Sequence, residues 1–194
     1  YNSSTERIQI KLLITQELWT DALEQQWIYY THSFQLNDYL AILKISEKAG
    51  DRSDWRKKAE QLLKQKAQEN PGKPWSHLWP DKLLEFYLHH EAYEKALAVV
   101  EKEKIELNLL LKLAWSISNQ PEKAFPLFQR VLESLIGQTN NNAYHQAIDI
   151  LKEMADKFKT KQQKQYMPEL LTQLRQKFRA KRNFIKWLNE AFDH

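Results

Sequence analysis

The chain has 194 residues, a formal net charge of +4, 42% hydrophobic residues and no cysteine. This length can bury one sizeable core or build one extended array of repeats. The lack of cysteine excludes disulfides, thiolate nucleophiles and cysteine-ligated zinc, and it is compatible with a reducing cytoplasm. No apolar run is long enough to cross a bilayer and no signal peptide is visible, so we expect a cytoplasmic protein with no membrane association.

The composition predicts an all-α fold. Glycine is scarce, valine and threonine are few, and the residues that favour helices are abundant. The three glycines Gly50, Gly72 and Gly137 each stand where a helical pattern stops, as C-terminal caps do. The chain begins at Tyr1 and not at Met, which is compatible with a piece of a longer protein.

The spacing of apolar residues divides the chain into eleven predicted helices. Asn37 with Asp38 is the predicted cap of the third, and Asp51 or Ser53 opens the fourth. Pro126 is predicted to bend its helix or to delay its start. The predicted ranges are 4–14, 16–32, 37–49, 53–68, 81–90, 91–103, 106–118, 121–136, 142–158, 161–180 and 183–192.

The clearest break in the helical pattern lies at 69–80, where three prolines and one glycine cannot continue a helix. We predict one helical-repeat domain over 1–194, with sub-blocks 1–68 and 81–194 joined by this loop. Trp75, Leu78 and Trp79 make the loop too apolar for a free linker. We therefore expect packing to hold it, and the two tryptophans are candidate partner-binding positions. Most of the other tryptophans are predicted to be core residues.

A weak internal echo indicates repeats. An aromatic residue or proline is followed, three positions on, by alanine and then by an apolar residue. A small side chain at a fixed place lets a neighbouring helix come close. The pattern resembles the second helix of tetratricopeptide hairpins and predicts antiparallel hairpins stacked as a degenerate, right-handed, tetratricopeptide-like solenoid. The copies start at Trp19, Tyr93, Pro121 and Tyr144.

The last third carries most of the excess positive charge. Residues 152–187 contain 11 basic and 3 acidic side chains. A solvated helix face explains such a run, and a site for an anionic partner is the functional alternative. The candidate partner-binding residues here are Arg175, Arg179, Lys181 and Arg182.

Two helices dominate this third, and the short linker at 159–161 predicts that they are antiparallel neighbours. Asn140 to Asn142 can cap the first of them. The short helix at 183–192 is predicted to begin at an Asn183 cap. It would close the open end of the core with Phe184 and Trp187, each worth about 3 kcal/mol when truncated to alanine.

A more specific resemblance covers the same region. The runs Thr-Asn-Asn-Asn-Ala-Tyr-His-Gln-Ala-Ile at 139–148 and Leu-Arg-Gln-Lys-Phe-Arg-Ala-Lys-Arg-Asn-Phe-Ile-Lys-Trp-Leu at 174–188 resemble the C-terminal region of bacterial SWIM zinc-finger proteins. The run 49–63 is similar to the helical part of the same proteins. That family's zinc motif needs three cysteines and a histidine, so no zinc ligand carries over. The resemblance implies a helical module without its metal-binding half, and a role in DNA or protein binding.

We find no motif that carries chemistry: no phosphate loop, no nucleophile elbow and no paired carboxylates. His89 and His90 point to different helix faces, and His145 with Asp149 supplies only two ligands. We therefore predict no catalytic, cofactor or metal residue and no cofactor.

The sequence thus favours a non-catalytic helical-repeat module that binds another macromolecule, most often a protein for such arrays. The alternative is a nucleic-acid-binding module that uses the basic segment 152–187, and an enzyme with a site assembled from distant positions is third. Scattered basic residues interleaved with acids would favour the protein partner, whereas a continuous basic stripe would favour nucleic acid. The identity of the partner and the oligomeric state do not follow from the sequence.

Overall fold

The computed structural model describes residues 3–69 and 78–192, and within them the chain is all-helical with no strand. It divides into two compact units, residues 1–105 and 106–194. The loop predicted to join two sub-blocks, 69–80, falls inside the first of these units, and most of it (70–77) lies outside the described residues, as does Gly72. The single repeat domain stays a prediction.

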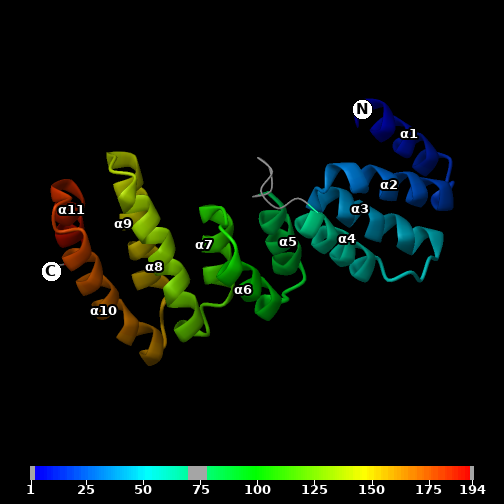
Figure 1. Cartoon of the computed structure of the whole chain (residues 1–194). Helices are drawn as coiled ribbons and strands as arrows, with labels where there is room; N and C mark the ends of the chain where they lie inside the picture. The colour runs from blue at the N-terminus through cyan, green and yellow to red at the C-terminus, as the bar shows by residue number, and fades with distance from the viewer. Residues whose placement is uncertain (1–2, 70–77, 193–194) are drawn as a thin grey trace. The chain divides into compact units, whose positions relative to one another are not determined.

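In the first unit, each helix packs against the next along the chain (Figure 1). The core is aromatic, and Tyr30, Tyr39 and Phe86 are each at most 2% exposed. The ring centroid of Tyr39 lies 5.9 Å from that of Tyr30 and 5.2 Å from that of Phe86. The helices are α1 (Ser3–Thr15), α2 (Trp19–Ser33), α3 (Leu36–Ala49), α4 (Trp55–Glu69), α5 (Leu78–His89) and α6 (Tyr93–Lys102).

The helix ends partly follow the predicted caps. Gly50 takes a left-handed conformation (φ 64°) after α3, as predicted. Asn37 and Asp38 do not cap the third helix, because they already lie in its first turn. The helix begins after Gln35, whose side chain makes no capping hydrogen bond. The fourth is capped by neither Asp51 nor Ser53 but by Asp54, whose carboxylate accepts the backbone N–H of Lys57 at 2.9 Å.

The same turn occurs twice with glutamate in the place of glycine. Glu17 after α1 and Glu91 after α5 have φ of 58° and 52°. The next residue's N–H reaches back five positions to a carbonyl, Leu18 to Leu13 and Ala92 to Tyr87, both at 2.9 Å. Gly50 belongs to a turn with the same pair of hydrogen bonds, which is the Schellman arrangement that normally selects glycine. The α1–α2 and α5–α6 hairpins are therefore locally alike.

The copies of the internal echo have similar positions in their helices. Trp19, Tyr93 and Pro121 are each the first residue of a helix, so the alanine three positions on has the same place in α2, α6 and α8. In the fourth copy the helix begins three residues before Tyr144. The four alanines, at 22, 96, 124 and 147, are all 0% exposed. Close helix approach at these points is what the pattern predicts.

In the second unit, the helices are α7 (Leu107–Ser116), α8 (Pro121–Gly137), α9 (Asn141–Lys157), α10 (Lys161–Lys177) and α11 (Arg182–Phe192). The prediction that the two long helices, α9 and α10, are antiparallel neighbours is wrong, because each packs against another helix. The closest backbone approach of α10 is to α8, and α11 approaches α9 (Figure 1).

Two residues of the α9–α10 linker region explain this change of partner. Phe158 ends α9 in an extended conformation and is 2% exposed, because its ring packs on Trp115, Phe125 and Phe128. Gln163 accepts the backbone N–H of Thr160 at 3.1 Å and donates to the Ser118 carbonyl at 2.7 Å. Both contacts direct the start of α10 toward the α7–α8 hairpin.

Other predictions for this unit are confirmed or corrected by the helix ends. Asn140 caps α9 by accepting the N–H of Ala143 at 2.9 Å, as predicted. Pro126 lies inside α8 and does not delay its start at Pro121. Gly137 is the last helical residue, and Thr139 takes the left-handed conformation instead.

The C-terminal helix α11 closes one end of this unit's core. Phe184 and Leu188 are 0% exposed. Asn183 does not cap the helix, because α11 begins one residue earlier at Arg182, and its amide donates to Asn141 at 3.2 Å. Trp187 is only partly buried and stacks on His145 with ring centroids 4.0 Å apart.

The prediction that most tryptophans are core residues is met only in part. All six that the structure describes, Trp19, Trp27, Trp55, Trp79, Trp115 and Trp187, are partly exposed. Each is large enough to bury one face against the core and leave an edge in solvent.

We expect Glu91→Gly to raise the free energy of unfolding by about 0.5–1 kcal/mol, because glycine adopts the left-handed conformation without the strain that a β-carbon adds. Urea unfolding measures the change. Glu24→Gly, inside α2, is the control and should lower stability by about 1 kcal/mol. If Glu91→Gly destabilised the protein as much as the control does, the turn would not have the conformation described.

We expect Phe184→Ala to cost about 3 kcal/mol, since the ring is fully buried. Trp187→Ala should cost less, about 1–2 kcal/mol, because part of the indole stays in solvent. Arg182→Ala is the exposed control, with a change of at most about 0.5 kcal/mol. Parallel urea melts rank the three variants, and a Phe184→Ala protein as stable as the parent would refute the closing role of α11.

Candidate functional site: a lysine-rimmed groove

The four basic candidates follow one another around the end of α10 and the start of α11. Arg175 donates to Asn189 Oδ1 at 3.1 Å, and Lys181 donates to Thr139 Oγ1 at 2.9 Å. Arg179 and Arg182 are exposed. Half of this predicted set is therefore engaged in contacts that hold α11 and the α8–α9 turn.

Many basic residues of the 152–187 segment lie beside carboxylates. Lys177 Nζ is 2.7 Å from Glu133, Lys159 is 3.8 Å from Asp156, and Lys186 is 3.8 Å from Glu190. Lys157 also pairs with Glu153. Four of the 11 basic residues of this segment are thus paired with acids, and the segment keeps a positive excess.

The two tryptophan candidates belong to the first unit. Trp75 lies outside the described residues. Trp79 is partly buried on α5, and its ring packs edge-on against Phe34 with centroids 4.7 Å apart. This contact gives Trp79 a packing role at the start of α5.

One groove of the first unit lies between α4, α5 and α6 and has a volume of about 430 Å³. Small apolar side chains form its floor, and lysines form much of its rim. The apolar lining consists of Ala67, Pro80, Leu83, Ala98 and Val99. The charged lining consists of Lys64, Lys95, Lys102 and Glu103.

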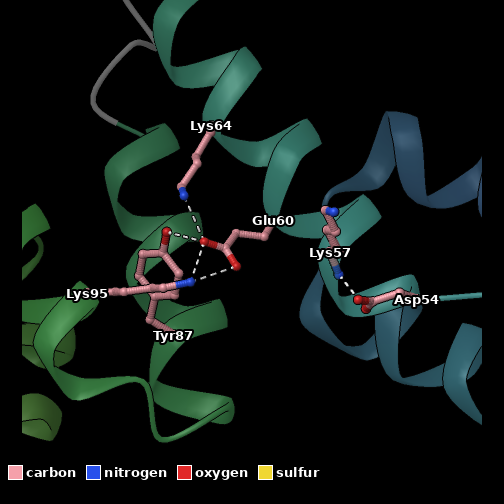
Figure 2. Close-up of polar contacts among 6 residues, drawn as sticks. All are labelled: Asp54, Lys57, Glu60, Lys64, Tyr87 and Lys95. Atoms are coloured by element: carbon pink, nitrogen blue, oxygen red, sulfur yellow. Dashed lines mark hydrogen bonds and ion pairs between the residues drawn. The ribbon is translucent and has the colours of Figure 1, made fainter.

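One carboxylate organises this rim. Glu60, on α4, accepts from Lys64 at 2.8 Å, from Lys95 of α6 at 2.8 and 3.0 Å, and from the Tyr87 hydroxyl of α5 at 3.1 Å (Figure 2). Three helices are tied to a single side chain. Burial alone would raise the pKa of Glu60, but the hydrogen bonds from Lys64, Lys95 and Tyr87 outweigh it and hold the pKa at about 2.

The lysines remain available to a partner in spite of these bonds. The side chains of Lys64 and Lys95 are 48% and 53% exposed, and each ammonium has three donors. With Lys102 they outnumber Glu60 and Glu103, so the rim keeps a positive excess. An apolar floor with a cationic rim can bind a segment that is apolar on one side and acidic at its edge.

Sequence reasoning missed this groove. Glu60 and Lys64 are four apart on a helix, and that spacing alone indicates their ion pair. Tyr87 and Lys95 lie 27 and 35 positions from Glu60, and no spacing rule connects them.

Tyr39 and His90 form an acid–base pair in the first unit, with the hydroxyl and Nε2 3.0 Å apart. Burial lowers the pKa of His90 to about 4, helped by the nearby charges of Arg56 and His89. Burial also raises the pKa of Tyr39 to about 12. Near neutral pH the protonated tyrosine and the neutral imidazole therefore share a hydrogen bond, which links α3 to the residue that follows α5.

Among residues 3–69 and 78–192, no group of three or more potential metal ligands comes together, and no helix has the length and apolarity needed to cross a bilayer. No family model, curated protein or solved structure matches this chain significantly.

The low pKa of His90 has a direct consequence for stability. The unfolded chain takes up a proton on this ring below about pH 6.5, whereas the folded protein does so only near pH 4. Stability should therefore fall as pH drops from 6.5 towards 4. In His90→Gln, which keeps a hydrogen-bonding side chain that does not titrate, we expect a shallower fall. Thermal midpoints at pH 7, 6 and 5 compare the two proteins, and equal slopes would show that His90 does not contribute.

Proposed function

We propose that this chain is a non-catalytic helical module that binds a protein partner, and that the α4–α6 groove is its binding surface. The observation that carries the proposal is the groove itself, with its apolar floor and the lysines at its rim. Its occupant is a partner segment with one apolar face flanked by acidic side chains. Apolar contact supplies most of the affinity, and the lysines select the partner's charge.

The repeated helix starts and the twin left-handed turns support a wider proposal, that the hairpins stack as a degenerate tetratricopeptide-like, right-handed solenoid. The resemblance of segments 49–63, 139–148 and 174–188 to the helical region of SWIM zinc-finger proteins supports the same class of function. On this proposal the chain acts in the cytoplasm as the helical part of such a protein.

Nucleic acid is the weaker alternative. Four of the 11 basic residues of 152–187 lie beside carboxylates, and this partial compensation favours a protein-binding surface over a continuous basic stripe. A phosphate backbone is bound through closely spaced, uncompensated charges. Any affinity for nucleic acid should be sequence-indifferent and should fall steeply as salt rises.

A labelled model peptide tests the proposed groove. The probe is an amphipathic helix with leucines on one face and glutamates along both edges of that face, read by fluorescence anisotropy. Val99→Glu places a charge on the apolar floor and should weaken binding at least about tenfold. Lys44→Glu, on the exposed face of α3, also introduces a glutamate, with a larger change of charge, outside the groove and should have little effect.

Two further probes separate the alternatives. A peptide with lysine in place of glutamate should bind much more weakly than the first. A single-stranded oligonucleotide should bind less tightly than the acidic peptide at physiological salt. Equal binding of both peptides, or loss of binding in Lys44→Glu but not in Val99→Glu, would refute the groove as the site.

A further inference from the structure

The second unit contains a groove of a different character. It lies between α8 and α10 and has a volume of about 150 Å³. Residues 122, 125, 126 and 129 line it from α8, and residues 166, 169, 170 and 173 line it from α10. Both sets follow the three-then-four spacing of one helix face, so the groove is the seam left where these two faces meet.

The walls of the groove are aromatic. Phe125 is 5% exposed and stacks on Tyr166 with ring centroids 4.7 Å apart and an angle of 28° between the rings. Phe125 is also packed against Phe158, so this side of the pair is fixed in the core. Tyr166 is partly exposed and lines the groove.

Two carboxylates border these walls, Glu122 from α8 and Glu169 from α10. Both are exposed, and neither forms an ion pair with another residue in the part of the chain that the structure describes. Glu169 accepts one hydrogen bond, from Gln173 Nε2 at 3.1 Å. The charge of the groove is therefore negative, although the unit around it is rich in lysine and arginine.

Pro126 also lies inside α8 and lines the groove. A proline has no N–H, so the helical hydrogen bond to the Glu122 carbonyl four residues earlier is not formed. The proline ring stands against that carbonyl, so the groups that a ligand would contact are the side chains of the groove.

We propose that the α8–α10 groove binds a single arginine side chain of a partner protein. A cavity of about 150 Å³ accepts a planar group the size of benzene. The guanidinium is planar, stacks on aromatic faces and has five donors, which suits Tyr166 and the two carboxylates together. Carboxylates repel phosphate, so this groove does not fit a nucleic acid. The inference concerns the second unit alone and does not depend on the α4–α6 groove.

Titration of the ¹⁵N-labelled full chain with the blocked tripeptide acetyl-Gly-Arg-Gly-amide tests the proposal by NMR. Saturable shifts are expected in the amides of Gln129, Glu169 and Gln173. The matched probe carries citrulline, which has nearly the shape of arginine without its charge, and should produce no saturable shift. The double variant Glu122→Gln with Glu169→Gln should weaken arginine binding at least about fivefold, because both charged contacts are lost.

Glu190→Gln is the control for the variant, since it removes one exposed carboxylate of the same unit outside the groove. Its affinity for the arginine peptide should equal that of the parent. Equal binding of the citrulline peptide, equal binding of a lysine peptide, or unchanged binding in the double variant would each overturn the assignment. These results are independent of the acidic-peptide test, so each groove can fail by itself.

Discussion

Close approach of neighbouring helices at small residues is the constraint on which the packing of both units depends. Alanines 22, 96 and 124 stand at the same position of their helices and are 0% exposed. A larger side chain there would push a neighbouring helix away. The turns before α2 and α6 bring each helix back at the required angle, and they do so with Glu17 and Glu91 in a conformation that glycine adopts more readily. Strain at these two residues is tolerated because the apolar contacts of the hairpins outweigh it.

The sequence predicts the helices well because their cause is local. The spacing of apolar residues places each of the eleven helices in residues 3–69 and 78–192 within a few residues of its observed ends. Asn140 and Gly50 are recognisable because a cap acts over only a few residues. Gly137 misled the prediction, since the left-handed residue after α8 is Thr139, two positions later. Glycine permits that conformation but does not require it.

Tertiary pairing is where sequence reasoning failed. A short linker predicts that α9 and α10 pack side by side, but linker length limits only how far α10 can start from the end of α9. Phe158 and Gln163 decide the direction, through contacts with residues 30 to 45 positions away. The set of hydrogen bonds to Glu60 was missed for the same reason. Its three donors come from three helices, and only Lys64 lies within reach of a local rule.

The charges of the two grooves bear on the choice between a nucleic acid and a protein as partner. The α4–α6 groove presents lysines, whereas the α8–α10 groove presents Glu122 and Glu169. A polyanion has favourable contacts with the first only, and it meets uncompensated carboxylates at the second. Polypeptides carry both signs of charge together with apolar side chains, so segments of protein can satisfy either groove. In the basic C-terminal segment, Lys157, Lys159, Lys177 and Lys186 have carboxylate neighbours, so the charge of its 11 basic residues is partly compensated. The contacts that each surface can offer to a polyanion or to a polypeptide depend on this local compensation more than on the net charge of +4.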